Sequence, residues 1–198
     1  MLTLGLTGMS GSGKSYVASI IAQYGIPSVD ADKIVHSLYS GENDCTRLIA
    51  KRFGENVLNA NHSINRKALG AIVFKDRDML SLLNETVHPY VIAEIENAQL
   101  NAIQNGDPAI VIDAPQLYEA RLETKCDYVI AVLTDTETQI KRIMTRDTIT
   151  EEAAKRRLSN QHSQEFFRER ADFCIENRDG DDISAQVFKI LKTIGLLV

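Results

Sequence analysis

A glycine-rich segment near the start of the chain restricts its fold more than any other feature. Residues 8–15 read GMSGSGKS and satisfy the pattern GxxxxGK[ST]. Apolar and polar residues alternate before this segment, as in a short strand, and apolar residues recur at helical spacing from Val17 to Tyr24 after it. Gly25 and Pro27 then end the helix. A strand, a glycine loop and a helix in this order are the setting that identifies a phosphate-binding loop.

The residue types of this loop predict its chemistry. Glycines let backbone N–H groups turn toward one point, and the positive end of the helix dipole adds to the same anion site. We expect Gly11, Ser12 and Gly13 to bind nucleotide phosphates together with Lys14, which reaches the β- and γ-phosphates. The Ser15 hydroxyl is expected to ligate Mg²⁺. A glycine-rich hairpin with a chance lysine is the alternative, and the flanking strand and helix argue against it.

Later apolar runs place the loop in an α/β fold. Residues 109–112 and 128–133 are short and β-branched, as are strands buried on both faces of a parallel sheet, and residues 173–175 form a minor run. Strands that alternate with helices predict a doubly wound sheet, whose ligands bind at the carboxyl ends of the strands. Between Asp32 and about Leu100 the pattern is helical, which indicates an insertion that adds a substrate site.

Two arginine-rich helices are predicted after the last long apolar run. The first starts near Thr134, in capping-box spacing with Glu137, and the second starts at Thr150. Arg142 and Arg146 stand at i, i+4, where like charges repel unless an anion lies between them. Kinases use such arginines to neutralise a transferring phosphoryl group under a closed lid. Four arginines downstream either contact phosphate or belong to a solvated helix face: Arg156, Arg157, Arg168 and Arg170.

Composition argues against several other functions. A formal net charge of −5 and a pI of about 5.4 offer no basic surface to nucleic acid or to an anionic membrane. The three cysteines are scattered without metal-binding spacing, as is typical of reduced thiols in a cytosol. No apolar run approaches the roughly 18 residues of a membrane span, and the N-terminus does not resemble a signal peptide. We expect a soluble, cytoplasmic protein that is a monomer or a weak homo-oligomer.

The loop alone does not distinguish GTPases, motor ATPases and kinases. A guanine-nucleotide switch needs DxxG after one strand and [NT]KxD after a later one. Here Asp113 begins DAPQ, without the glycine, and the TKCD of residues 124–127 precedes its strand, so we interpret TKCD as chance. Asp113 is either a Walker B carboxylate that holds the Mg²⁺ shell through water or a polar strand terminus, and the sequence leaves both open.

Asp32 is the candidate for the catalytic base. It follows a short extended segment, residues 26–29, which puts it near the carboxyl edge of the sheet. Phosphoryl transfer to an alcohol needs a carboxylate that orients the hydroxyl and accepts its proton. The alternative is that Asp32 is the N-cap of a helix starting at Lys33, which would stabilise the helix by about 1 kcal/mol and play no part in catalysis.

A series of short motifs runs along nearly the whole chain. They are LTG at 6–8 with the loop that follows, VDAD at 29–32, FG at 53–54, NRKAL at 65–69, VF at 73–74, VHP at 87–89, DAPQLYE at 113–119, Gln139, Arg142, RD at 146–147, Gln161, AD at 171–172 and IEN at 175–177. In this order they resemble the dephospho-CoA kinase family, whose members transfer the ATP γ-phosphate to the ribose 3′-hydroxyl of dephospho-CoA. The set is far more specific than the loop alone.

The resemblance implies an ATP-dependent phosphotransferase that uses ATP with Mg²⁺ and acts on dephospho-CoA, in the last step of coenzyme A biosynthesis. The implied fold is α/β: a P-loop NTPase-type, three-layer parallel sheet in a single domain over residues 1–198. A helical acceptor-binding insertion would occupy about residues 32–92, and an arginine-rich helical lid would occupy about residues 142–168.

The same resemblance implies roles for single residues. Asp32 would be the base that contacts the acceptor, Arg142 would lie near the nucleotide, and Arg146 would act on the phosphates during catalysis. Asn177 would approach the adenine. The acceptor pocket would be lined by Arg66, His88 and Tyr118. From the residues alone, Arg66 is a surface residue, His88 is a helix-capping or core histidine, and Asn177 is a turn residue.

Some positions depart from the family's pattern. Tyr16 stands where threonine usually follows the loop serine, and its place in the first helical turn lets it contact the nucleotide. Gln116 replaces an apolar residue and alters the expected apolar wall of the acceptor site. Two alternative hypotheses remain for the function. One is a nucleoside or nucleoside-monophosphate kinase with the same loop and lid, and the other is a non-enzymatic P-loop switch.

Overall fold

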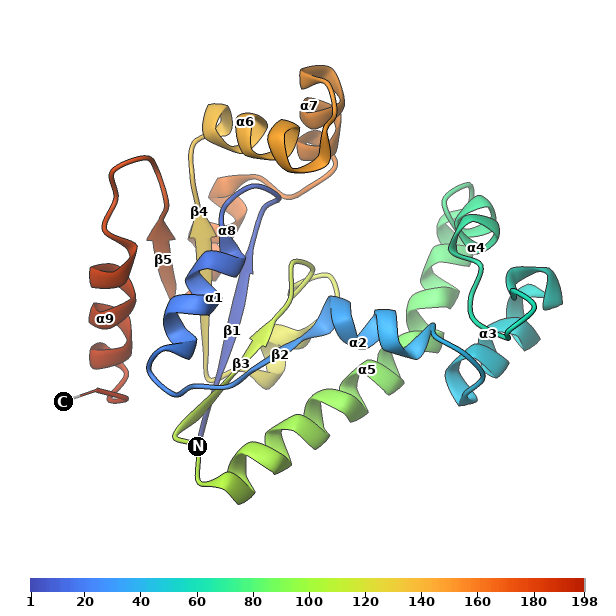
Figure 1. Ribbon diagram of the computed structural model, residues 1–198, viewed down its shortest axis with the longest axis horizontal. Helices are drawn as coiled ribbons and strands as arrows, with labels where there is room; N and C mark the ends of the chain where they lie inside the picture. Colours follow the sequence, from blue (N-terminus) through green and yellow to red (C-terminus); the bar gives the residue numbers. More distant parts are fainter. Residues whose placement is uncertain (198) are drawn as a thin grey trace. The chain divides into compact units, whose positions relative to one another are not determined.

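The computed structural model describes residues 1–197, which form two compact units. One comprises Met1–Val29 with the chain from Asn101 onward, and the other comprises Asp30–Leu100. The first unit is built on a parallel sheet and the second is helical (Figure 1).

The sheet has five strands: β1 (Leu2–Gly8), β2 (Ser28–Asp30), β3 (Ala109–Asp113), β4 (Tyr128–Leu133) and β5 (Phe173–Glu176). Their order is β2-β3-β1-β4-β5, and β1 pairs in parallel with both β3 and β4. The strand order therefore changes direction at β1, which carries the glycine loop at its carboxyl end. Doubly wound sheets bind their ligands at this position, and the predicted α/β class is confirmed.

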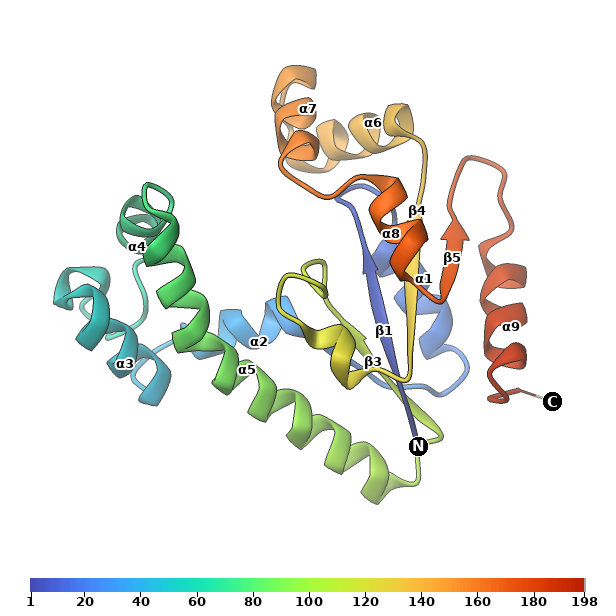
Figure 2. The same ribbon diagram turned by 180° about the vertical axis from the view of Figure 1, so that it is seen from behind.

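Helices cover both faces of the sheet. Every residue of β3 is buried, as is β4 apart from its first residue, which is the burial expected of central parallel strands. Helices α1 (Lys14–Ala22) and α9 (Ile183–Thr193) pack on one face through a shared apolar cluster. On the other face, seen in Figure 2, α8 (Gln164–Arg170) buries Phe167 against Leu133. The core on both faces fixes the strand ends that carry the loop.

Two helices that follow β4, α6 (Thr136–Asp147) and α7 (Glu151–Ser159), form a helical hairpin. Asp135 caps α6 by accepting a hydrogen bond from the Thr138 N–H at 2.8 Å, so the predicted capping box from Thr134 to Glu137 is wrong. Thr150 caps α7, as the sequence predicts. The name hairpin is used below for α6, α7 and the residues up to Gln161.

The second unit contains α2 (Ala31–Leu38), α3 (Asp44–Phe53), the short 3-10 helix η1 (Glu55–Val57) and α4 (Arg66–Val73). Helix α5 (Arg77–Asn105) begins in this unit and ends in the first. The helical pattern expected after Asp32 is therefore confirmed. The buried apolar side chains of the second unit include Cys45, Ile49, Val57, Leu69 and Ile95.

The TKCD segment has a structural role. Its first two residues end the 3-10 helix η2 (Leu122–Lys125), and the Asp127 carboxylate accepts the Thr3 N–H at 2.7 Å, which fixes the start of β1. This agrees with the interpretation of its guanine-binding pattern as chance. None of the helices in residues 1–197 combines the length and the apolar character that a membrane span requires.

Candidate active site

The glycine loop joins β1 to α1 in a conformation that needs its glycines. Gly11 and Gly13 have φ values of 78° and 91°, in the left-handed region. A Cβ at Gly13 would overlap the Asn177 side chain, and one at Gly11 would lie 2.8 Å from the backbone oxygen of Gln139. Gly13 is also the N-cap of α1, and no side chain within residues 1–197 caps this helix end. The first-turn amides of α1 are therefore open to an anion.

Lys14 and Asp113 form an ion pair between the first residue of α1 and the last residue of β3. Their side chains are only 15% and 10% exposed. Parallel pairing sets Leu6 of β1 beside Asp113, which brings the carboxylate next to the loop. Asp113 is thus more than a solvated strand terminus, because it contacts the loop lysine. Ser15 is the next residue of α1.

Asn177 follows β5 and connects the loop to the hairpin. Its Nδ2 donates to the Ser12 carbonyl oxygen at 2.7 Å, and its own carbonyl oxygen accepts from Arg142 Nη1 at 3.1 Å. Asn177 is 7% exposed, and its backbone N–H donates to the Leu133 oxygen at 2.7 Å. The Ser12 Oγ is buried and has no hydrogen-bond partner among the described residues. These bonds hold the second half of the loop.

Arg142 and Arg146, the i, i+4 pair of α6, have different partners. Arg142 Nη2 lies 3.6 Å from Asp179 Oδ1. Arg146 donates from Nε and Nη2 to both Asp147 oxygens at 2.8 and 2.9 Å, and Arg157 pairs with the same carboxylate. Hydrogen bonds from Arg146, and then from Arg157, lower the pKa of Asp147 to about 2. Carboxylates therefore relieve the repulsion that the i, i+4 spacing creates.

Asp32 is the second residue of α2 and is not its N-cap. The cap is Asp30, the last residue of β2, whose side chain accepts the Lys33 N–H at 3.0 Å. The alternative of a capping role for Asp32 is wrong because β2 runs directly into α2. Asp32 lies in the first helical turn, where the positive end of the helix dipole stabilises a negative charge.

Arg66, the first residue of α4, contacts a histidine that the sequence did not single out. Its Nη2 lies 2.9 Å from His36 Nδ1, and its guanidinium carbon lies 5.5 Å from the centre of the Tyr39 ring. A guanidinium has no acceptor, so His36 Nδ1 must accept the hydrogen bond. His36 stands four residues after Asp32, so both lie on one face of α2.

The other predicted contact residues belong to different elements of the chain. His88 lies inside α5, which excludes a helix-capping role, and burial lowers its pKa. Tyr118 packs perpendicular to Phe166 with ring centres 5.3 Å apart, and burial raises its pKa to about 12. The Tyr118 hydroxyl is buried without a partner among the described residues. Tyr16 is 56% exposed on α1.

A model of the dephospho-CoA kinase family matches residues 2–182 of the chain. The match includes the loop, the helical unit and the hairpin. The chain belongs to the dephospho-CoA kinase family.

Curated dephospho-CoA kinases are similar over nearly their whole length. The one from Listeria monocytogenes serotype 4b is 36% identical over 191 residues, which are 96% of each chain. The one from Halalkalibacterium halodurans is 37% identical over 192 residues, again 96% of each chain. The nucleoside or nucleoside-monophosphate kinase considered from the sequence is not favoured by these relatives.

Solved structures agree with the family. A dephospho-CoA kinase from Campylobacter jejuni superposes with a TM-score of 0.69 at 30% identity, covering 97% of this chain and 96% of that one. A Thermus thermophilus protein, TT1252, has a TM-score of 0.80 at 24% identity, covering 98% and 97%. A shikimate kinase from Acinetobacter baumannii shares the fold with a TM-score of 0.53 at 17% identity, covering 98% and 93%. The chain is a kinase with a P-loop nucleotide-binding fold.

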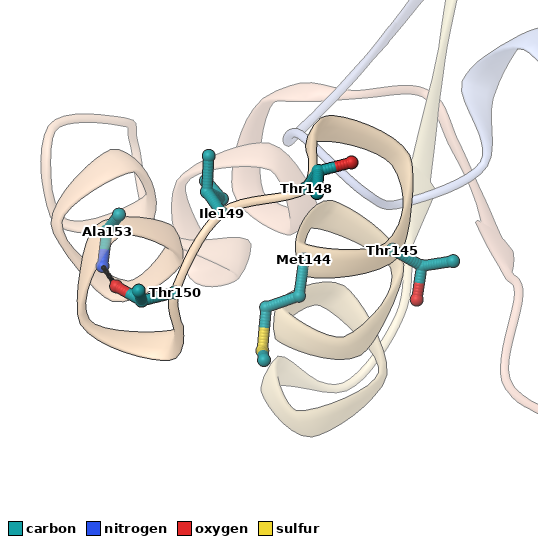
Figure 3. Close-up of a pocket in the computed structure, with 6 residues that line it drawn as sticks. All are labelled: Met144, Thr145, Thr148, Ile149, Thr150 and Ala153. Atoms are coloured by element: carbon teal, nitrogen blue, oxygen red, sulfur yellow. Dashed lines mark hydrogen bonds between the residues drawn. The ribbon is translucent and has the colours of Figure 1, made fainter.

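A cavity of about 630 Å³ lies at the turn of the hairpin in this family member. It is lined by Met144, Thr145, Thr148, Ile149, Thr150 and Ala153, as Figure 3 shows. None of these residues belongs to the predicted site. The cavity is therefore not the nucleotide or acceptor site that the sequence predicts.

Sequence reasoning missed the contacts that hold Ser10 at the tip of the loop, and with them the roles of two glutamines. Gln161 accepts the Ser10 N–H, Gln139 lies beside its carbonyl oxygen, and Arg146 lies beside its hydroxyl. Both glutamines are among the residues that carry the family resemblance, and this was the one signal available for them. Neither had been given a role.

Proposed function

We propose that the chain transfers the γ-phosphoryl group of ATP to the ribose 3′-hydroxyl of dephospho-CoA. The observation that carries this proposal is the family match over residues 2–182, which includes every residue proposed for the site. The chemistry of the site supports the proposal, because a phosphoryl transfer needs anion-binding groups, a lid with cations and a carboxylate for the hydroxyl.

The ATP phosphates bind at the glycine loop. The amides of Gly11 and of residues 13–15, at the uncapped end of α1, attract the triphosphate, and Lys14 shifts from Asp113 toward the β- and γ-phosphates. Arg142 and Arg146 supply positive charge from the hairpin as the phosphoryl group moves. Asn177 and Tyr16 complete the nucleotide side of the site.

Mg²⁺ fits the oxygen donors beside Lys14. Ser15 contributes a hydroxyl in the first turn of α1, and Asp113 contributes a carboxylate from the end of β3. Such oxygen ligands suit Mg²⁺, which binds few protein groups directly and keeps several waters. When bound, the ion would neutralise charge on the β- and γ-phosphates.

Asp32 acts as the base in this proposal. Its carboxylate accepts a hydrogen bond from the 3′-hydroxyl, which orients the oxygen for in-line attack on the γ-phosphorus. The carboxylate takes the proton as the new P–O bond forms and the bond from the γ-phosphorus to the bridging oxygen of ADP breaks. The position of Asp32 in the first turn of α2, where Asp30 is the N-cap, supports this assignment. The acceptor is bound by Arg66, His88 and Tyr118, and Arg66 pairs with its phosphates.

The proposal extends to the setting of the enzyme. A net charge of −5 offers no basic surface to nucleic acid or to an anionic membrane, which supports small-molecule substrates, ATP and dephospho-CoA, as the partners. The use of ATP and the three free cysteines support a cytoplasmic location. We propose a monomer or a weak homo-oligomer.

A coupled ADP-release assay tests the proposal. The purified protein is supplied with ATP, Mg²⁺ and one acceptor from a panel of dephospho-CoA, adenosine, AMP, CMP and dTMP. We expect dephospho-CoA to stimulate ADP release far more than any other acceptor. A strong preference for a mononucleotide would assign the chain a different acceptor, and no stimulation by any acceptor would contradict phosphoryl transfer to an alcohol.

A further inference from the structure

Ser10, at the tip of the glycine loop, is held by three side chains of the hairpin. Its N–H donates to Gln161 Oε1 at 3.0 Å. Its carbonyl oxygen lies 3.4 Å from Gln139 Nε2, and its hydroxyl lies 3.4 Å from Arg146 Nη2. These contacts join positions that are 129 to 151 residues apart in the chain. One loop residue thus connects the phosphate site to both ends of the hairpin.

The Ser10 amide is already used in a hydrogen bond within the protein, to Gln161. A backbone N–H that donates to a side chain at 3.0 Å is not available to a phosphate oxygen. Gln161 is exposed and follows α7. Its bond with Ser10 connects the first half of the loop to the end of the hairpin. The Ser12 N–H donates to the Met9 backbone oxygen at 3.1 Å, so the amides that remain for phosphate are those of Gly11 and of residues 13–15.

Gln139 contacts Ser10 as well, through the Ser10 carbonyl oxygen. It lies in α6 and is 1% exposed, and its backbone oxygen packs so closely on Gly11 that a Cβ there would lie 2.8 Å away. Its Oε1 is buried and has no hydrogen-bond partner among the described residues. A buried acceptor without a hydrogen bond costs free energy. A shift of the loop on ligand binding that gives Gln139 Oε1 a hydrogen bond would therefore be favourable.

We propose that Gln161 and Gln139 are positioning residues of the ATP site, which couple the hairpin to the phosphate loop through the backbone of Ser10. Movement of the hairpin must either carry the loop with it or break these bonds. Phosphate binding at the loop is therefore coupled to the position of the hairpin, which carries Arg142 and Arg146. This inference rests on the proposed binding of ATP at the loop and adds to it two residues that do not touch the nucleotide.

A matched pair of variants separates positioning from simple packing. Gln186 makes similar bonds elsewhere in the same unit, because its Oε1 accepts the Glu176 N–H and its Nε2 donates to the Glu176 oxygen, both at 2.9 Å. Gln161→Met and Gln186→Met each remove side-chain hydrogen bonds to the backbone and keep a side chain of similar length. Gln186 lies in α9, and its bonds are to β5.

ATP affinity and the kinetic constants of these variants are the first test. The loss of one positioning hydrogen bond in Gln161→Met should raise the Kd and KM for ATP by about 3- to 10-fold and leave the KM for dephospho-CoA nearly unchanged. Gln186→Met should bind ATP like the wild type, even if its Tm falls. Unchanged ATP binding in Gln161→Met, or equal weakening in both variants, would overturn the inference.

The wild-type protein supplies a second readout that does not depend on the folding of a variant. The Ser10 amide should exchange slowly with deuterium in the nucleotide-free wild-type protein, because it donates to Gln161 Oε1. Rapid exchange of the wild-type Ser10 amide would contradict the coupling. Failure of the wild type to bind ATP would instead contradict the proposed function, so the two failures are distinguishable.

Discussion

Lys14, the first residue of α1, forms an ion pair with Asp113, the last residue of β3, and both side chains are largely buried. A buried ion pair is stable only while each charge keeps a partner, because removal of one charge leaves the other without compensation. The lysine ammonium is a compact charge on a flexible stem, so it can be shared between this carboxylate and an arriving phosphate. The pair therefore holds the loop lysine at the site before nucleotide binds.

Lys14→Met should weaken ATP binding and lower kcat by roughly 10²- to 10³-fold, the usual effect of removing one group that stabilises transition-state charge. It should also lower stability by about 1–3 kcal/mol, because the Asp113 carboxylate loses its cation. Steady-state kinetics and denaturant unfolding measure the two effects. Lys155→Met is the control, since Lys155 pairs with Glu151 on the exposed side of α7. Wild-type turnover in Lys14→Met would contradict the assignment.

The Asp147 cluster predicts a pH-dependent difference in stability. Arg146 and Arg157 lower the pKa of Asp147 from 3.8 to about 2. A lowered carboxyl pKa adds stability that is fully present above the ordinary value and is lost as the pH falls through about 2. Asp147→Asn should therefore melt below the wild type at pH 7, and the gap in Tm should close between about pH 4 and pH 2. A constant gap across that range would exclude this linkage.

Asp32→Asn should lower kcat by roughly 10²- to 10⁴-fold, with ATP binding nearly intact, because the amide cannot accept the proton of the 3′-hydroxyl. Asp30→Asn is the matched control two residues away. Asparagine caps helices as well as aspartate does, so this variant should keep α2 and most of its turnover. Single-turnover kinetics and ATP titration distinguish the outcomes. Full activity in Asp32→Asn would remove Asp32 from the role of base.

His36 should affect the affinity for dephospho-CoA, because it is hydrogen-bonded to Arg66. His36→Leu removes the acceptor of the 2.9 Å contact with Arg66 and should raise the KM for dephospho-CoA by about 3- to 10-fold, with the KM for ATP unchanged. His36→Asn places an amide oxygen near the position of Nδ1 and should restore most of the affinity. Equal KM values in the wild type and both variants would show that the contact does not serve the acceptor.

Local patterns in the sequence predicted much of the first unit. The runs at residues 109–112 and 128–133 correspond to β3 and β4, because strands buried on both faces must be apolar throughout. The loop and α1 followed from glycine chemistry and helical spacing. Element ends were less accurate: Asp135 caps α6 in place of Thr134, since neighbouring residues of similar capping ability compete for one position.

Long-range contacts within each unit were not predictable in this way. His36 and Arg66 are 30 residues apart, and Ser10 and Gln161 are 151 residues apart. No local periodicity links such pairs, because the fold alone brings them together. The cap of α2 was missed for a related reason, since the end of β2 at Asp30 also begins a helix without an intervening loop.

The position of the transferred phosphate tests the central claim most directly. The protein is incubated with ATP, Mg²⁺ and dephospho-CoA, and the product is examined by ³¹P NMR. We expect a new phosphomonoester resonance coupled to the ribose 3′ proton, formed in equal amount with ADP. A phosphate on any other oxygen, or ATP hydrolysis without a phosphorylated acceptor, would contradict the central claim.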